Sequence, residues 1–502
     1  MLTVSPGSPT FRAMDAGRTI ARHLVIGLPP GGITPDWERD FAAFPPAGVL
    51  VFRRDFGDLA DLRRLTARLR ELARPLRLLV AMDEEGGFVS QLRGHLTVPP
   101  NAALLARGAE PGDLEWAARV TGHRLRALGV DWVFAPVADV NALPANPVIG
   151  PRAYGVESGT AARGVAEVVR GFQAAGVACC LKHFPGHGST ALDSHLALPT
   201  CAADRVTLER HDLEPFRAGL AAPAVMTAHV LYPALDAEHP ATFSRGIVRG
   251  LLRGTLGFRG VCVTDALEMQ GAALGRTPFE AATLALEAGC DLLLFARDDG
   301  SLPRLRAELA EALENGRLDR ADLEAAARRL AAFERAFADP TAEELARPLE
   351  ALTPAGWEER LERIVTRGLV VRGALPPEAA SRPWRVEAPD CLEGPGFRGC
   401  LGNAGVPLRL LLAEPAAGEE PGVDVVLVQS RVPLPADEVE RLRALCRARA
   451  TVIVGLQNDA FLEALPEAAV RISAADATPL TRRQVARAVA ALWRAAGGTA
   501  DP

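Results

Sequence analysis

Two short stretches of the sequence carry the residue types that acid–base and nucleophilic chemistry require. In Asp193-Ser194-His195 a carboxylate and an imidazole lie two residues apart, and in an extended loop such residues point to the same side. Asp193 can then fix the tautomer of His195, whose imidazole suits proton donation and proton removal near neutral pH. Asp265 follows the apolar run Val261–Thr264, where a carboxylate is costly to bury unless it is used. These residues predict a nucleophile and a general acid/base.

Each of these groups also has a purely structural interpretation. A DxH triplet is common and can brace a loop by a hydrogen bond, and Asp265 can cap the helix that follows it. If instead the carboxylate and the imidazole face one sugar ring, they are the minimum machinery for retaining glycoside hydrolysis. Asp265 would attack the anomeric carbon, while His195 would protonate the leaving oxygen and then activate water. We therefore predict a retaining glycosidase.

Further polar residues are predicted to bind sugar hydroxyls by directional hydrogen bonds. They are Asp83, Arg152, Lys182 and His183. Lys182 is the only lysine among 56 basic residues, which indicates a place that needs a compact ammonium and not a guanidinium fork. His229 is a fifth candidate, although it is equally typical of a histidine whose hydrogen bonds are satisfied in the core.

The elements that must position these residues alternate along the first 335 residues. Near-continuous apolar runs, typical of parallel strands covered on both faces, are separated by longer amphipathic, helix-like stretches. The pattern predicts a (β/α)8 barrel, with a doubly wound open sheet as the alternative. The eight runs are His23–Leu28, Gly48–Phe52, Leu76–Met82, Trp132–Val137, Gly176–Leu181, Ala224–Ala228, Val261–Thr264 and Cys290–Phe295.

The candidate residues follow the apolar runs and do not precede them. Each lies one or two positions beyond the end of a run, as the sequence shows for Asp83, Asp139, Lys182, His229 and Asp265. The carboxyl ends of the strands in a (β/α)8 barrel share one rim, where active sites are built. We therefore expect these side chains to converge in one site.

The rest of the chain has its own pattern. We predict a catalytic barrel over residues 1–340, a linker over 341–355, and a smaller α/β sandwich-like domain over 356–502. Within the last part, two stretches are typical of buried strands and two of helices. The strand-like stretches are 424–429 and 450–456, and the helix-like stretches are 435–448 and 480–493.

Composition narrows the function classes. The net charge of −6 lacks the basic footprint of nucleic-acid binding, and no apolar run approaches the roughly 20 residues of a membrane span. The N-terminus shows no basic-then-apolar signal pattern, so we expect a cytoplasmic protein. The eight cysteines form no CxxC pair and are expected to be buried thiols. The expected partner is a small glycoside, and the oligomeric state is left open.

A metal hydrolase is a competing interpretation of the same histidines. His183 and His187 have an H-x3-H spacing that zinc ligands use. Further ligands are available in His195, His229 and Asp265. However, Pro185 and Gly186 break any helix that would present the pair, so we expect neither a metal nor another cofactor.

The motif Lys182–Gly188, followed by Asp193-Ser194-His195, resembles the signature of glycoside hydrolase family 3, in its β-N-acetylglucosaminidase branch. The resemblance covers roughly residues 20–335. It implies Asp265 as nucleophile, His195 as acid/base with Asp193 as its partner, and sugar contacts from Asp83, Arg152, Lys182 and His183. It also implies release of terminal N-acetylglucosamine from glycosides such as cell-wall muropeptides, without a metal. Support comes from Asp83–Gly87, Phe134–Val140, Ile149–Arg152, Val225–His229 and Gly257–Gly260.

The sequence also departs from this family pattern. Phe88 and Gln91 stand where relatives usually have arginines, and Ser189 and Ala266 stand where an aspartate is common. Three alternatives therefore stay open: a β-glucosidase or β-xylosidase, whose acid/base generally comes from elsewhere; an N-acetylglucosaminide phosphorylase, since a neutral histidine does not repel phosphate; and a non-enzymatic sugar-binding module.

Overall fold

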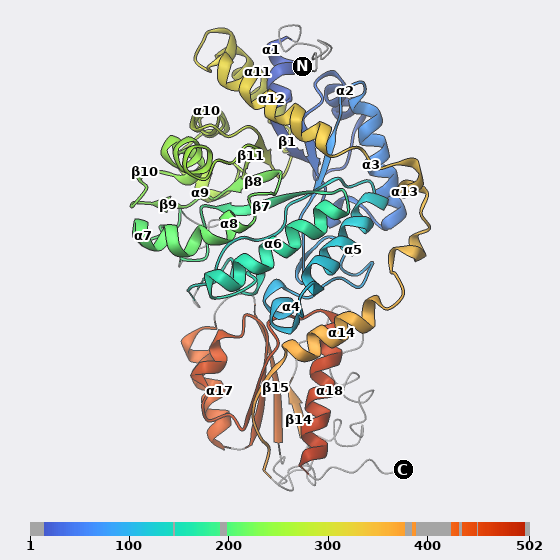
Figure 1. Cartoon of the computed structure of the whole chain (residues 1–502), viewed down its shortest axis with the longest axis vertical. Helices are drawn as coiled ribbons and strands as arrows, with labels where there is room; N and C mark the ends of the chain where they lie inside the picture. The colour runs from blue at the N-terminus through green and yellow to red at the C-terminus, as the bar shows by residue number, and fades with distance from the viewer. Residues whose placement is uncertain are drawn as a thin grey trace, which may run out of the picture.

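Eight strands form the centre of the N-terminal part of the structure (Figure 1). The computed structural model describes residues 15–143, 146–190, 198–376, 384–387, 423–430, 434–448 and 450–496. The strands lie in the order β11-β8-β7-β6-β3-β2-β1-β12, and neighbouring strands are parallel. They are β1 (Leu24–Gly27), β2 (Gly48–Leu50), β3 (Leu79–Met82), β6 (Trp132–Val133), β7 (Ala178–Phe184), β8 (Ala224–Thr227), β11 (Val261–Thr264) and β12 (Leu293–Phe295).

The two ends of this sheet meet and close a barrel. Val263 of β11 forms a parallel bridge with Leu292, which immediately precedes β12. The backbone N–H of Thr264 donates to the carbonyl of Leu292 at 3.0 Å, and the N–H of Leu267 donates to that of Leu294 at 2.9 Å. The predicted (β/α)8 barrel is therefore confirmed, and the open doubly wound sheet is wrong.

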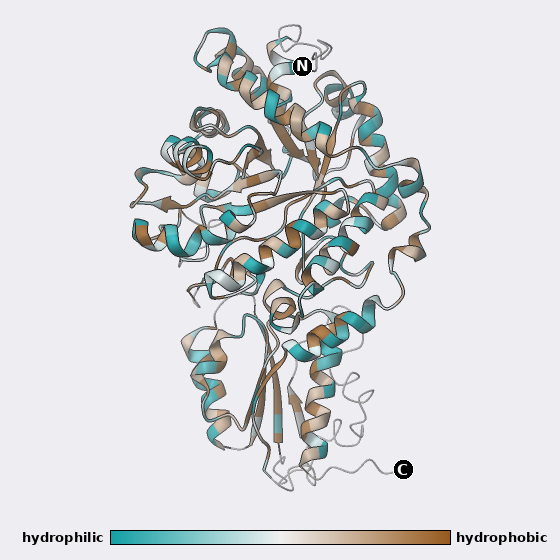
Figure 2. Cartoon of the chain, in the orientation of Figure 1, coloured by the Kyte–Doolittle hydropathy of each residue, from teal (hydrophilic) through white to brown (hydrophobic). Residues whose placement is uncertain are grey.

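The apolar runs form strands because both of their faces are covered. Side chains alternate between the inside of the barrel and the surrounding helices, as period-two geometry requires. In β1, Val25 packs with Trp132 and Phe134 inside the barrel, whereas Leu24 and Ile26 pack in the outer core beneath the helices. Figure 2 shows the result as brown strands surrounded by helices with teal outer faces.

Helices follow the strands and cover the barrel. Their ends carry the expected capping residues: Asp58 caps α3, and Thr277 and Glu280 form a capping box at α10. The helices of this part are α1 (Ala16–Ala21), α2 (Pro35–Ala43), α3 (Leu59–Ala73), α4 (Ala102–Gly108), α5 (Asp113–Ala127), α6 (Ser158–Ala174), α7 (Arg205–Thr207), α8 (Glu214–Ala218), η6 (Gly246–Thr255), α9 (Gln270–Ala273), α10 (Pro278–Ala288), α11 (Leu302–Glu314) and α12 (Arg320–Ala336).

One strand is longer than the sequence pattern predicted. The apolar run ends at Leu181, but β7 continues through Lys182 and His183 to Phe184. Both polar side chains are buried and find charged partners inside the barrel, so the strand does not need to end at the first polar residue. Two short antiparallel strand pairs lie outside the eight-stranded sheet. They are β4 (Glu84–Gly86) with β5 (Val89–Ser90), and β9 (Leu231–Tyr232) with β10 (Asp236–Pro240).

A second, smaller sheet lies beyond the barrel. After α13 (Ala342–Ala346) and α14 (Trp357–Gly368), five strands pair in the order β13-β17-β16-β15-β14, all parallel except β13. Helix α17 lies on one side of this sheet and helix α18 on the other (Figure 1). The elements are β13 (Val370–Gly373), β14 (Trp384–Glu387), β15 (Val423–Ser430), α17 (Ala436–Ala448), β16 (Thr451–Gln457), β17 (Val470–Ser473) and α18 (Pro479–Ala495).

The second sheet turns the carboxyl ends of its parallel strands toward the barrel. Asn101, at the start of α4, donates from its side chain to the carbonyl of Ala475 at 2.9 Å, and its backbone N–H donates to the carboxylate of Asp476 at 3.1 Å. Arg107 of α4 donates to the hydroxyl of Ser473 at 2.7 Å. Short polar contacts therefore join the two parts. In the described part of the chain, no helix has both the length and the apolar character that crossing a membrane requires.

Candidate active site

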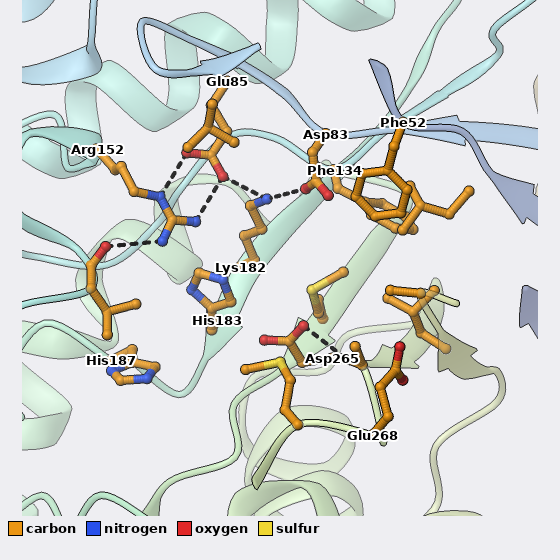
Figure 3. Close-up of a pocket in the computed structure, with 18 of the residues that line it drawn as sticks. Phe52, Asp83, Glu85, Phe134, Arg152, Lys182, His183, His187, Asp265 and Glu268 are labelled. Atoms are coloured by element: carbon orange, nitrogen blue, oxygen red, sulfur yellow. Dashed lines mark hydrogen bonds and ion pairs between the residues drawn. The ribbon is translucent and has the colours of Figure 1, made fainter. Parts of the chain in front are cut away.

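A cavity of about 790 Å³ opens at the carboxyl ends of the barrel strands. Ten of its lining residues carry charge or an imidazole, and the seven of them that are not exposed come from β7 and from the segments that follow β3, β6, β7 and β11. The seven are Asp83, Glu85, Arg152, Lys182, His183, His187 and Asp265. The structure thus brings together, at one rim, five of the side chains predicted from the sequence: Asp83, Arg152, Lys182, His183 and Asp265 (Figure 3).

Lys182 extends between two carboxylates. Its ammonium lies 2.6 Å from Asp83 Oδ1 and 2.6 Å from Glu85 Oε1, and its side chain is only 3% exposed. Burial by itself lowers the pKa of Lys182, but Asp83 and Glu85 outweigh that effect and raise the pKa above its ordinary value. The ammonium is therefore charged and can donate its remaining proton toward a ligand.

Arg152 is held by the same Glu85. The guanidinium donates to both carboxylate oxygens, at 2.7 and 2.8 Å, and to the carbonyl of Val148 at 3.1 Å. Burial raises the pKa of Glu85, but Arg152 and Lys182 reverse this and bring the pKa to about 2. Glu85 was not among the predicted site residues. Its signal was present in the Asp83–Gly87 motif, but the sequence does not say which carboxylate of the motif faces the cavity.

Asp139 fixes the orientation of His183 from beneath. Its buried carboxylate lies 2.7 Å from His183 Nδ1 and accepts the backbone N–H groups of His183 and His187 at 3.2 and 2.6 Å. Burial raises the pKa of Asp139, but the two histidines lower it below its ordinary value. The contact leaves His183 Nε2 as the ring atom that can reach the cavity.

His187 also lines the cavity, although the sequence offered it only within a motif and as a candidate zinc ligand of the competing interpretation. Its Nδ1 lies 2.9 Å from the hydroxyl of Thr190. Burial and the neighbouring His183 lower the pKa of His187 to about 4, so that its imidazole is neutral at physiological pH.

Asp265 immediately follows β11 and faces the cavity from the side opposite the Lys182 cluster (Figure 3). One carboxylate oxygen accepts the N–H of Ala266 at 2.8 Å. Burial raises the pKa of Asp265, but His183, His229 and Lys182 together hold it below the ordinary value. The carboxylate is therefore ionised at neutral pH, as a nucleophile must be.

His229 lies behind Asp265 and does not line the cavity. It is 1% exposed, with Nδ1 2.8 Å from the Thr242 hydroxyl and Nε2 donating to the carbonyl of Ala266 at 3.0 Å. Both ring nitrogens are engaged because a threonine and a backbone carbonyl lie on opposite sides of the ring. This geometry is that of the satisfied core histidine, the alternative that the sequence offered, and the predicted sugar contact of His229 stays a prediction.

Asp193 and His195 lie outside the described residues. The description stops at Thr190 and resumes at Leu198. Thr190 itself is anchored, since Asn146 donates to its carbonyl at 2.9 Å. The predicted pairing of Asp193 with His195 therefore stays a prediction.

The mouth of the cavity carries residues that the sequence reasoning did not select. Exposed polar side chains and one aromatic ring surround it: Phe52, Arg54, Glu268, Gln270 and Arg297. They also follow strand ends, but exposed polar residues are too common in loops to stand out in a sequence.

The side chain of Gln91, one of the departures from the family pattern, contacts backbone groups beside the site. Its side chain donates to the carbonyl of Asp83 at 3.3 Å and accepts the N–H of Arg53 at 2.8 Å. Phe88, the other departure at this loop, lines the cavity. Among the described residues, no three His, Cys, Asp or Glu side chains are grouped as a metal site would need.

A known protein family matches most of the barrel-forming part of the chain. The profile described as "Glycosyl hydrolase family 3 N terminal domain" matches residues 43–333, more than half of the chain. The chain belongs to glycoside hydrolase family 3. A β-hexosaminidase of Nitrosospira multiformis is 39% identical over 270 residues, which are 52% of this chain and 76% of that protein. A β-hexosaminidase of Alkalilimnicola ehrlichii is 38% identical over 300 residues, 57% of this chain and 84% of that protein.

The family 3 fold extends to the second sheet. A glycoside hydrolase family 3 β-N-acetylglucosaminidase from Paenibacillus sp. str. FPU-7 has a solved structure that is 28% identical. It superposes with a TM-score of 0.82 and covers 95% of this chain and 97% of its own. A β-glucoside phosphorylase, BglX, at 20% identity and a TM-score of 0.80, shares the fold. This family 3 chain is thus a glycosidase with a two-part architecture.

Proposed function

We propose that this family 3 glycosidase is a retaining exo-β-N-acetylhexosaminidase that releases terminal N-acetylglucosamine from β-glycosides. The observation that carries the proposal is one cavity in which an ionised carboxylate, Asp265, faces a buried cluster of hydrogen-bonding groups built around Lys182. Two β-hexosaminidases at 38–39% identity and a β-N-acetylglucosaminidase of similar fold support the choice of sugar.

The cluster binds the terminal sugar. Hydroxyl groups of a pyranose both donate and accept, so they can accept from Lys182, Arg152 and His183 Nε2 and donate to Asp83. Asp83 and Glu85 compensate the charges of Lys182 and Arg152, so an uncharged sugar does not have to neutralise them. Because these groups line the wall opposite Asp265, a sugar held there presents its anomeric carbon to the carboxylate.

The reaction then proceeds in two displacements. Asp265 Oδ2, the oxygen that does not accept from Ala266, attacks the anomeric carbon as the bond to the leaving oxygen breaks. His195, paired with Asp193, protonates that oxygen and later removes a proton from the water that cleaves the glycosyl–Asp265 ester. The configuration at the anomeric carbon is retained. Muropeptides are the glycosides that we propose as its source of N-acetylglucosamine.

Two substitutions test the assigned roles, with p-nitrophenyl N-acetyl-β-D-glucosaminide and an unactivated N-acetylglucosamine disaccharide as substrates. We expect Asp265→Asn to abolish turnover of both, whereas Asp299→Asn, a matched exposed aspartate after β12, keeps it. His195→Ala should lose about 100-fold or more on the disaccharide but far less on the aryl glycoside, whose leaving group needs no proton. Wild-type rates for both variants on the disaccharide would contradict the proposal.

The covalent intermediate and the acceptor need separate measurements. In His195→Ala with the aryl glycoside, the ester should accumulate, and mass spectrometry should find one N-acetylhexosamine on the peptide that contains Asp265. The p-nitrophenyl glucoside should be cleaved far more slowly than the N-acetylglucosaminide. In phosphate buffer, free sugar should be the product; sugar 1-phosphate would instead identify a phosphorylase.

A further inference from the structure

A second cavity, of about 370 Å³, lies between the barrel and the second sheet. From the barrel it is lined by α4, by Asn141 and by the segment that leads into α6, and from the second sheet by the end of β16 and the residues that follow β16 and β17. Helix α4 lies at this junction in Figure 1. Open α/β sheets bind their ligands outside the carboxyl ends of their parallel strands, so the cavity lies where a ligand of the second domain is expected.

Backbone conformation distinguishes the wall that the second sheet contributes. Gln457, the last residue of β16, and Ala475, which follows β17, have φ angles of 66° and 51°. In the part of the chain that the structure describes, no other residue except glycine has such a left-handed φ. A side chain in this region strains the backbone, and strained residues cluster at functional sites. Both positions line this one cavity, which indicates that the cavity has a use.

Carboxamide side chains line the cavity without using all of their hydrogen-bonding groups. Gln457 is 3% exposed, yet its side-chain amide forms no hydrogen bond with any described residue. Asn458 is 5% exposed, and its side-chain oxygen accepts the N–H of Ala460 at 3.3 Å, whereas its side-chain nitrogen has no acceptor among the described residues. On the barrel side, the side-chain oxygen of Asn141 is buried and has no described partner either. Buried polar groups are normally paired, so these amides are available to a ligand.

The rest of the lining is paired, exposed or apolar. Arg107 donates to the hydroxyl of Ser473 at 2.7 Å and lies 4.0 Å from Asp459, so the two opposite charges compensate each other. Glu157, the third charged residue among the described lining residues, is exposed to solvent. The interior therefore favours an uncharged ligand with small alkyl groups. Small apolar side chains form much of the remaining wall: Ala103, Ala106, Pro151, Ala153, Val156, Ala460 and Ala475.

We propose that this interdomain cavity binds an uncharged ligand that carries a secondary amide beside a small alkyl group, as a short peptide or an N-acetylated sugar does. A carboxamide can donate to the carbonyl of such an amide and accept from its N–H, while the apolar wall covers the alkyl group. The inference goes beyond glycoside hydrolysis, because none of the described lining residues also lines the sugar cavity around Asp265 and Lys182.

The two cavities nevertheless share one segment of the barrel. Arg152 lines the sugar cavity, whereas its neighbours Pro151 and Ala153 line the interdomain cavity. Asn458 Nδ2 lies 3.9 Å from the place that a Cβ would occupy at Gly150, in the same segment. A ligand between the domains would therefore contact the segment that presents Arg152 to the sugar.

Isothermal titration of the full chain with N-acetyl-L-alanyl-L-alanine amide, and separately with N-acetylglucosamine, tests the proposal. Gln457→Met keeps the length of the side chain but removes its amide, and Ala106→Leu fills the cavity from α4. We expect at least one probe to bind at a site whose affinity falls about tenfold or more in both variants. Gln173→Met, on α6 and outside the cavity, is the matched control and should bind as the wild type does. Thermal unfolding establishes beforehand that each variant is folded.

The two probes identify the source of the amide. Peptide binding that both cavity variants weaken supports a peptide ligand. N-acetylglucosamine also binds in the sugar cavity, so an acetamido ligand is supported by a second sugar site that Gln457→Met removes and Gln173→Met keeps. The proposal is overturned if neither probe binds at such a site, or if both cavity variants bind with wild-type affinity. Because binding and not turnover is measured, this result is separate from the test of the proposed glycosidase function.

Discussion

At the scale of single residues, Lys182 shows why one lysine persists in a chain that otherwise uses arginine. A compact ammonium can lie 2.6 Å from carboxylates on both sides, whereas a planar guanidinium has a larger, fixed arrangement of donors. Arg152 already occupies the bidentate position on Glu85. A second guanidinium would therefore compete for the same oxygens.

Replacing Lys182 by arginine should consequently damage sugar binding although the charge is kept. We expect kcat/KM for p-nitrophenyl N-acetyl-β-D-glucosaminide to fall about 100-fold, since two charge-assisted contacts are lost or distorted. Arg304→Lys, at an exposed helix position, is the control and should leave kcat/KM unchanged. A Lys182→Arg enzyme with normal kinetics would show that the ammonium geometry is unimportant.

Glu84 is a second residue whose environment sets its chemistry. It is 2% exposed and accepts the hydroxyl of Ser90 at 2.5 Å and the N–H groups of Gln91 and Leu92 at 2.8 and 3.2 Å. Burial outweighs these contacts and raises the pKa of Glu84 to about 7. The folded protein therefore holds a proton on Glu84 between pH 4.5 and 7, where the unfolded chain releases it.

This shift predicts a pH-dependent stability. The pKa of Glu84 is raised in the folded state, so its contribution to the free energy of unfolding is complete below pH 4.5. This contribution is lost as the pH rises toward 7, by roughly 3 kcal/mol in total. Glu84→Gln, which can keep the same contacts without titrating, should flatten the decline in the thermal unfolding midpoint between pH 5 and 8. Glu314→Gln, at an exposed position, should keep the wild-type slope. Equal slopes in all three proteins would contradict this account.

At the scale of elements, the segment after β7 is held against the neighbouring strand end. Asp139 accepts the N–H of His187, and a Cβ at Gly188 would lie only 1.6 Å from the carbonyl oxygen of Val140. The backbone of this segment thus touches the backbone that follows β6. Close packing of two loops sets the path on which the chain leaves the cavity toward Asp193 and His195.

Gly188→Ala should therefore displace this segment. We expect a loss of stability of about 1–3 kcal/mol from overpacking and a fall in kcat/KM of at least about tenfold, because catalytic groups are sensitive to shifts of ~1 Å. Gly250→Ala, at an exposed position of helix η6 where a Cβ meets nothing closer than 4.0 Å, is the matched control. Thermal unfolding and steady-state kinetics of both variants decide the point, and an unperturbed Gly188→Ala enzyme would refute it.

At the scale of the whole molecule, Asn101 connects the active-site loop to the second domain. Its side-chain oxygen accepts the N–H of Phe88 at 3.0 Å, and its side-chain nitrogen donates to Ala475 at 2.9 Å. The residue is 2% exposed, so water does not replace these contacts. One side chain thereby fixes a loop of the sugar cavity to the carboxyl end of β17.

We expect Asn101→Ala to weaken both ends of this connection. Two buried backbone groups would lose their partners, at about 1–3 kcal/mol each, and the thermal unfolding midpoint should fall by about 2–6 °C. Amide hydrogen exchange should rise at Phe88 and in the first turns of α18. Asn315→Ala, whose side chain bonds only within an exposed helix end, should change neither quantity. Unchanged exchange at Phe88 in Asn101→Ala would show that the loop does not depend on the domain contact.

The sequence by itself favoured a barrel and determined which candidate residues follow the apolar runs. Near-continuous apolar runs are typical of strands covered on both faces, and polar residues at the carboxyl ends of barrel strands share one rim. The closure of the sheet, which excludes the open doubly wound alternative, was decided by the tertiary structure. Asp83, Lys182, His183 and Asp265 were placed correctly at that rim because their positions follow from the chain order alone. The family was also evident in the motif Lys182–Gly188.

Tertiary structure alone decided which partners these residues have. Glu85 became part of the site, Asp139 became the partner of His183, and His229 was turned away from the cavity, through contacts between segments that are 13 to about 100 residues apart. Periodicity reports the faces of single elements, whereas these contacts depend on how side chains from different elements pack together.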